Sequence, residues 1–235
     1  MVTRLCECIK LEMPIGFPCE EWTSFSQSIS PKMDASGIDR LLSYVANGWN
    51  AIPWRYRAFA EADESFRVNL HANDTFEERY AQENALFAFH AAGVSIVECY
   101  AFALSAVTEF MSGRGHKFSQ PGFVTNMGMR SLRERVDARF GSDPFKEILD
   151  LFFNDPMWKK LFERRHIFTH RGAPPRGYWV GGPKHGTAEL KLAAHDQPED
   201  VLVSDALTAD IFAWLTRELG VLVKEGESFA LRHLS

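Results

Sequence analysis

The amino-acid sequence predicts an all-α protein, a helical bundle with one short β-hairpin or extended insertion before its C-terminal helix. A proline-free run from about Thr75 to Met111 carries apolar residues on nearly every helical face, as expected for the central helix of a bundle. Shorter amphipathic stretches lie on both sides of this run. Short extended stretches around a glycine-rich turn occur at about 173–200, and Leu5–Leu11 could hold one further short strand.

These observations predict an irregular N-terminal segment, residues 1–32, followed by a single helical domain over 33–235. An apolar stripe from about Met33 predicts a helix that ends at Asn47-Gly48, and Pro53 suits the first turn of a second helix. After the central helix we expect a loop at 116–130, a basic helix over Ser131–Phe140, a helix opened by Asp143-Pro144, a helix with Asp155 at the N-cap and Pro156 at N1, and a final helix over about Ser204–Lys224.

Composition predicts a soluble, cytoplasmic protein. Of the 235 residues, 46% are hydrophobic and 24% are charged, which is ordinary for a globular domain and excludes global disorder. We find no apolar run of membrane-spanning length and no signal-like N-terminus, so no membrane association is expected. Four cysteines are too few for a disulfide framework in a chain of this length.

The charge distribution is uneven. The chain has a net charge of -5, yet Trp158–Lys191 carries eight lysine and arginine residues against two glutamates, and Arg114–Arg139 is also basic. A basic zone on an acidic protein fits contact with a phosphate backbone on one face. The alternative is that these cations pair with acidic residues elsewhere in the fold.

One segment, Leu161–Gly172, brings an arginine and two histidines to the end of an amphipathic helix. Gly172 and Pro174-Pro175 stop that helix. Arg165 and His170 are five positions apart, roughly 140° around a helix, and the long arginine side chain can bridge that angle. An arginine can hold a phosphate, and a histidine with a pKa of ~6.5 can exchange a proton near neutral pH.

The run Arg165-His166-Ile167-Phe168-Thr169-His170 resembles the signature of the HEPN superfamily of all-α bundles, an arginine, a polar residue and a histidine after four to six intervening positions. The resemblance covers about Ala81–Gly172. It implies a metal-independent endoribonuclease, often a toxin or defence protein, that leaves a 2′,3′-cyclic phosphate and dimerises so that two motifs share a cleft. It equally allows a non-catalytic bundle that binds nucleotides or scaffolds other proteins.

On this resemblance Arg165, His170 and His166 would be catalytic, and four cations would hold flanking phosphates, namely Lys160, Arg164, Arg171 and Arg176. No cofactor or metal is required. The partners implied are RNA, a second copy of the chain and a possible antitoxin or regulatory protein.

Glu98 is predicted to support the site, because it is a lone carboxylate in the apolar central helix and a buried charge needs a partner such as Arg165. In the simpler interpretation Arg165 is only that structural partner, and His170 only interacts with the helix dipole. His166 and His170 also have the i, i+4 spacing of a zinc pair, but no third ligand is evident. A further alternative, an interaction module, predicts an exposed Trp214–Leu215 stripe on the final helix.

Overall fold

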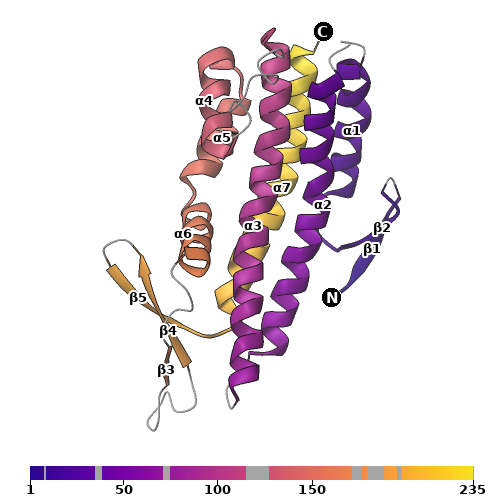
Figure 1. The fold of residues 1–235 in the computed structure, drawn as a ribbon. Coiled ribbons are helices and arrows are strands. Elements are labelled where there is room, and N and C mark those ends of the chain that lie inside the picture. Colours follow the sequence, from indigo (N-terminus) through magenta and orange to yellow (C-terminus); the bar gives the residue numbers. More distant parts are fainter. Residues whose placement is uncertain are drawn as a thin grey trace. The chain divides into compact units, whose positions relative to one another are not determined.

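The computed structural model describes residues 1–7, 9–34, 39–70, 75–114, 127–170, 176–178, 188–194 and 197–234. These residues form seven helices and five short strands, which confirms the all-α bundle with a short β insertion (Figure 1). The helices are α1 (Cys19–Asp34), α2 (Asp39–Val68), α3 (Phe76–Met111), α4 (Met129–Phe140), α5 (Phe145–Asn154), α6 (Pro156–His170) and α7 (Ala206–His233). The strands are β1 (Thr3–Cys6), β2 (Leu11–Pro14), β3 (Arg176–Tyr178), β4 (Ala188–Ala194) and β5 (Gln197–Leu202).

The chain divides into two compact units. Unit 1 contains Met1, 57–94 and 156–215, and unit 2 contains 2–56, 95–155 and 216–235. The residues of α2, α3 and α7 are therefore shared between the units. Each unit is described separately below.

Helix α3 matches the predicted central helix and begins with a reciprocal cap. The Glu78 backbone N–H donates to Thr75 Oγ1 at 3.2 Å, and the Thr75 N–H donates to Glu78 Oε2 at 2.9 Å. By length and composition α3 would pass for a membrane span, contrary to our expectation that no run is long enough, but 67% of its most apolar stretch is buried. Such burial is typical of the core helix of a soluble protein.

The prediction of an irregular N-terminal segment is wrong. Strands β1 and β2 pair as an antiparallel hairpin, with Thr3 opposite Pro14, and α1 follows from Cys19. Gly16 lies in the turn between β2 and α1, and its φ of 108 is in the region that favours glycine. Burial of the aromatic side chains of this segment, Phe17 among them, compensates for its proline and serine content.

Helix α2 is one continuous helix where the sequence predicts two. Gly48 lies inside this helix and does not end it. A Cβ at this position would lie 2.9 Å from Phe102 Cδ1 and 3.0 Å from the Cys99 carbonyl oxygen of α3. The glycine therefore permits close packing of α2 on α3. Pro53 also lies inside α2, so its missing N–H is tolerated within the helix.

Unit 2 is held by polar contacts as well as by its apolar core. In Figure 1, α1 and the unit 2 parts of α2, α3 and α7 run side by side. Tyr100 Oη on α3 donates to the Leu222 carbonyl on α7 at 2.6 Å. Asp143, just before α5, accepts two hydrogen bonds from Arg232 and contacts His233 Nε2 at 2.9 Å. Asp143 Oδ1 also accepts a hydrogen bond at 2.9 Å from the N–H of Phe145, the first residue of α5, and this helix begins where Asp143-Pro144 predicts.

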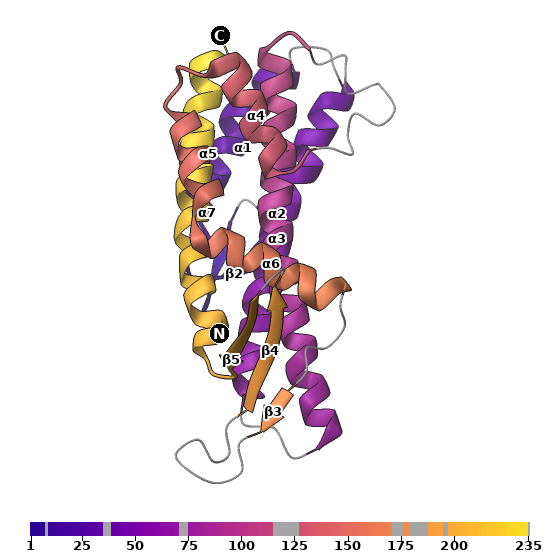
Figure 2. The same ribbon diagram turned by 90° about the vertical axis from the view of Figure 1, so that its left-hand side faces the viewer.

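Unit 1 contains α6 and a three-stranded antiparallel sheet in the order β3-β4-β5. The sequence predicts the first two strands but not β5. Figure 2 shows β4 directed toward α6, and these two elements are in contact. The interaction-module prediction fails, because Trp214 and Leu215 are buried at 4% and 0% exposure. Helix α7 also continues past Lys224 to His233.

Candidate functional site

The candidate site lies at the C-terminal end of α6. This helix begins at Pro156, as its sequence predicts, since proline at N1 loses no intrahelical hydrogen bond. Leu161 is fully buried and packs close to α3 at Gly93, where a Cβ would lie 3.1 Å from Leu161 Cδ1 and 3.0 Å from Phe59 Cε2. A glycine at this position of α3 thus allows α6 to approach closely.

The last turn of α6 is anchored by an apolar cluster. Ile167 and Phe168 are buried there with residues from α2, α3 and α7 of unit 1, namely Phe66, Ala85, Leu86 and Leu207. Val201 and Val203 pack against the same cluster. A cluster of this kind fixes the rotation of α6 about its axis, so Arg165 and His166, just before Ile167 and Phe168, leave the helix in fixed directions.

The predicted catalytic residues flank this anchor. The side chain of Arg165 is half-buried and that of His166 is exposed. Thr169 Oγ1 donates to the Arg165 carbonyl oxygen at 2.8 Å, which stabilises the last turn. His170 is the final residue of α6, and its side chain lies outside the described residues.

Arg164 does not suit the phosphate-holding role that the resemblance implies. Its side chain is buried at 4% exposure, and its Nη1 donates to the Leu207 carbonyl in the first turn of α7 at 3.3 Å. A guanidinium in this position ties α6 to α7 instead of facing solvent. Arg164 and Arg165 are adjacent in sequence, but the helix turns one inward and leaves the other partly accessible.

A buried histidine behind the motif is not predicted from the sequence. His90 on α3 is fully buried; its ring stacks on Phe168 with the centroids 5.0 Å apart, and its Nδ1 lies 2.8 Å from the Leu86 carbonyl oxygen. Nε2 has no hydrogen-bond partner among the described residues. Burial, together with the nearby positive charge of Arg164, lowers the pKa of His90 to about 3, so the ring is neutral. Its position as a titratable residue inside an apolar run is the sequence signal that would have identified it.

The remaining cations of α6 differ from Arg164. Lys159 is exposed and Lys160 is half-buried. Lys159, Lys160 and Arg165 form no ion pair with a described side chain; the ion pairs among described residues involve other cations. Of the other predicted phosphate ligands, Arg176 opens β3 opposite Leu190, and Arg171 lies outside the described residues.

Glu98 is not the buried carboxylate of α3 that the sequence argument assumes. Its side chain is exposed and belongs to unit 2. The fully buried carboxylate is Glu109, which sequence reasoning missed because it lies near the end of the apolar run. Glu109 Oε1 pairs with Arg139 Nη1 at 2.5 Å and with Arg135 Nε at 3.1 Å, both on α4.

Within the described residues, no three histidine, cysteine or acidic side chains come together as a metal site would require. No protein-family model, curated protein or solved structure matches this chain. The assignment of function therefore depends on the residues of α6 and their surroundings.

Proposed function

We propose that the C-terminal end of α6 binds RNA and cleaves it without a metal ion. The observation that carries the proposal is a set of cations on α6, Lys159, Lys160 and Arg165, that form no ion pair with a described carboxylate. They lie on the helix that carries the HEPN-like Arg165–His170 spacing. Cations without internal partners can neutralise phosphates and release counterions, which favours nucleic-acid binding.

The chemistry follows from the residue types. The ribose 2′-oxygen attacks the adjacent phosphorus while the bond from phosphorus to the 5′-oxygen breaks, which leaves a 2′,3′-cyclic phosphate and a 5′-hydroxyl. A histidine removes the 2′-hydroxyl proton, and a proton is delivered to the leaving 5′-oxygen. We assign the proton transfer to His170, with His166 as the second proton-transfer or RNA-orienting group. Arg165 stabilises the charge that develops on the phosphoryl oxygens.

The anchor beneath the motif supports this assignment. Ile167 and Phe168 are buried between Arg165 and His170, so the two polar residues are attached to a rigid segment, as a catalytic group must be. The resemblance also implies a homodimer with a shared cleft, RNA as the partner, and a setting in a toxin or defence system with a possible antitoxin.

The test is RNA cleavage by the purified protein in EDTA. We expect cyclic-phosphate ends with the wild type and a loss of cleavage of at least about 100-fold in His170→Ala and in Arg165→Ala. Lys224→Ala on α7 is the control, because it removes a cation far along the sequence from the motif. Absence of cleavage on transfer, ribosomal and messenger RNA would contradict the enzymatic proposal.

A second candidate is a non-catalytic bundle that binds nucleotides or scaffolds other proteins. Phe76, Tyr80 and Phe87 favour it, because they form an exposed aromatic stripe along one face of α3, with exposures of 82%, 61% and 42%. In this case Arg165→Ala would leave RNA intact, as the wild type does, and Tyr80→Ala would change the oligomeric state or partner binding.

A further inference from the structure

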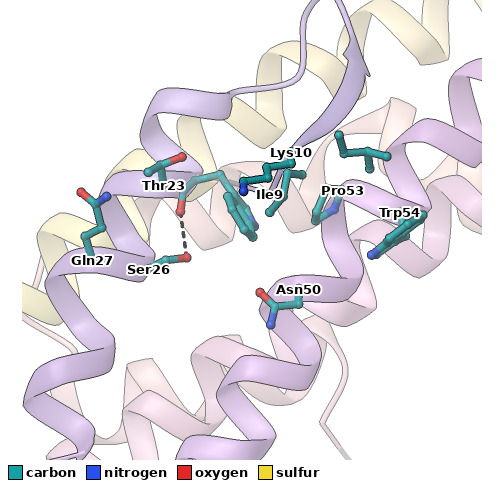
Figure 3. Close-up of a pocket in the computed structure, with 10 residues that line it drawn as sticks. Ile9, Lys10, Thr23, Ser26, Gln27, Asn50, Pro53 and Trp54 are labelled. Carbon is teal, nitrogen blue, oxygen red and sulfur yellow. Dashed lines mark hydrogen bonds between the residues drawn. The ribbon is translucent and has the colours of Figure 1, made fainter. Parts of the chain in front are cut away.

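Unit 2 contains an open pocket that is separate from the α6 motif in sequence. It has a volume of about 630 Å³ and lies between the turn of the β1–β2 hairpin, α1 and the middle of α2 (Figure 3). Small-molecule sites usually enclose roughly 300–1,000 Å³. All of its lining residues belong to unit 2, so the pocket is defined within one unit.

The base of the pocket is pre-formed. Trp22 is buried there, and its Nε1 donates to the Trp49 carbonyl at 3.1 Å while Trp49 Nε1 donates to the Trp22 carbonyl at 3.1 Å. The two indole rings are nearly parallel, with an interplanar angle of 11°. This reciprocal pair ties α1 to α2, so a ligand would not have to order the base of the pocket on binding.

Polar and aromatic groups with unused hydrogen-bonding capacity surround the opening. Gln27 on α1 and Asn50 on α2 contribute amides, and Trp54 lies one helical turn after Asn50 (Figure 3). These three side chains are exposed and form no side-chain hydrogen bonds within the described part of the chain. In contrast, the hydroxyl group of Ser26 already donates to the Trp22 carbonyl oxygen.

The charge at the opening is positive. Lys10 sits in the hairpin turn with φ 50, the one positive φ of a non-glycine residue among those described. Its ammonium is in no ion pair with a described side chain, and the pocket lining contains no aspartate or glutamate. In a chain of net charge -5, such a lining favours an anionic ligand over a cationic one.

We propose that this pocket binds a nucleoside monophosphate. The Trp54 indole offers a face on which a base can stack. The amides of Gln27 and Asn50 both donate and accept, as the polar edge of a base requires. Lys10 holds the phosphate as a point charge. A lining without carboxylates suits a base better than a bare sugar, whose hydroxyl groups need strong acceptors.

The test is calorimetric titration of the full chain with AMP, GMP, CMP and UMP up to millimolar concentration. We expect saturable binding of at least one nucleotide, weakened about fivefold or more in Trp54→Ala, since loss of one stacked base costs about 1–3 kcal/mol. Leu151→Ala is the control, because Leu151 is a large apolar side chain exposed to 71%, against 62% for Trp54, and lies outside the pocket.

Lys10→Asn tests the phosphate contact, because asparagine tolerates positive φ and carries no charge. It should weaken binding of the nucleotide but not of the corresponding nucleoside. The proposal is overturned if no nucleotide binds, if ribose 5-phosphate binds as tightly, or if Trp54→Ala binds like Leu151→Ala. His170→Ala should retain this binding, so failure of the ribonuclease proposal and failure of this one are distinguishable.

Discussion

Helices α4 and α6 are both basic in sequence, but their charges are used differently. On α4, Arg130 pairs with Glu134 and Arg133 with Asp150, and both Arg135 and Arg139 pair with the buried Glu109. On α6, only Arg164 is turned inward, and no described carboxylate pairs with Lys159, Lys160 or Arg165. The density of basic residues along the chain does not distinguish a neutralised helix from one able to bind an anion.

The difference arises from burial. A carboxylate inside a protein must be compensated, and Glu109 recruits two guanidinium groups from α4. Burial lowers the pKa of Arg135, while Glu109 acts to raise it. The side chain of Arg133 also lies over the Phe153 ring at 4.7 Å. Arg135 and Arg139 of α4 are therefore structural, whereas Lys159, Lys160 and Arg165 of α6 pair with no described carboxylate.

The largest expected effect is that of Glu109→Ala. Removing the carboxylate leaves two partly buried guanidinium groups without their shared partner, and we expect the free energy of unfolding to fall by about 3–5 kcal/mol. Urea denaturation followed by circular dichroism measures this. A loss below about 1 kcal/mol would break the distinction between α4 and α6.

The next test separates the two arginines of α6. Arg164→Ala should destabilise the protein by about 2–4 kcal/mol, because it removes a buried side chain and leaves the Leu207 carbonyl without that donor. Arg165→Ala should cost less than about 1 kcal/mol and reduce the salt dependence of RNA binding instead. Equal losses of stability in the two variants would show that Arg165 is also structural.

The buried His90, which packs against α6, should make the free energy of unfolding depend on pH. Its folded pKa of about 3 lies below the ordinary value of 6.5, so the unfolded chain takes up the proton first as pH falls. Stability from this residue is complete above pH 6.5 and is lost progressively toward pH 3, by about 2 kcal/mol at pH 5.

In His90→Phe the decline in unfolding free energy between pH 7 and pH 5 should be smaller by that amount. Parallel urea titrations at the two pH values measure it. His166→Asn is the control, since His166 is exposed. An unchanged pH profile in His90→Phe would show that His90 is not held neutral against α6.

The smallest effect is expected at the surface of α4. Arg130 and Glu134 are 81% and 63% exposed, so Glu134→Ala should change the free energy of unfolding by less than about 0.5 kcal/mol. The same denaturation experiment compares it with Glu109→Ala. A large effect here would mean that the exposed pairs of α4 are also part of its framework.

Much of the helical framework is predictable from local signals. Thr75 with Glu78, Asp143 and Pro156 mark helix starts that the structure confirms. The failures have tertiary causes. Asn47-Gly48 predicts a helix stop, but α2 continues through Gly48, which permits close packing against Phe102. The β1–β2 hairpin is stabilised by pairing between two four-residue strands, and neither strand alone carries a pattern that predicts this pairing.

The sequence by itself determined the helical class, the central helix and the position of the Arg165–His170 spacing at a helix end, because periodicity, caps and breakers act over a few residues. Only the tertiary structure decided that Arg164 is buried, that Glu98 is exposed while Glu109 is buried, and that His90 lies against Phe168. These outcomes depend on which side of each helix meets another element. Residues far apart in the chain set that contact, and the charge or accessibility of each side chain follows from it.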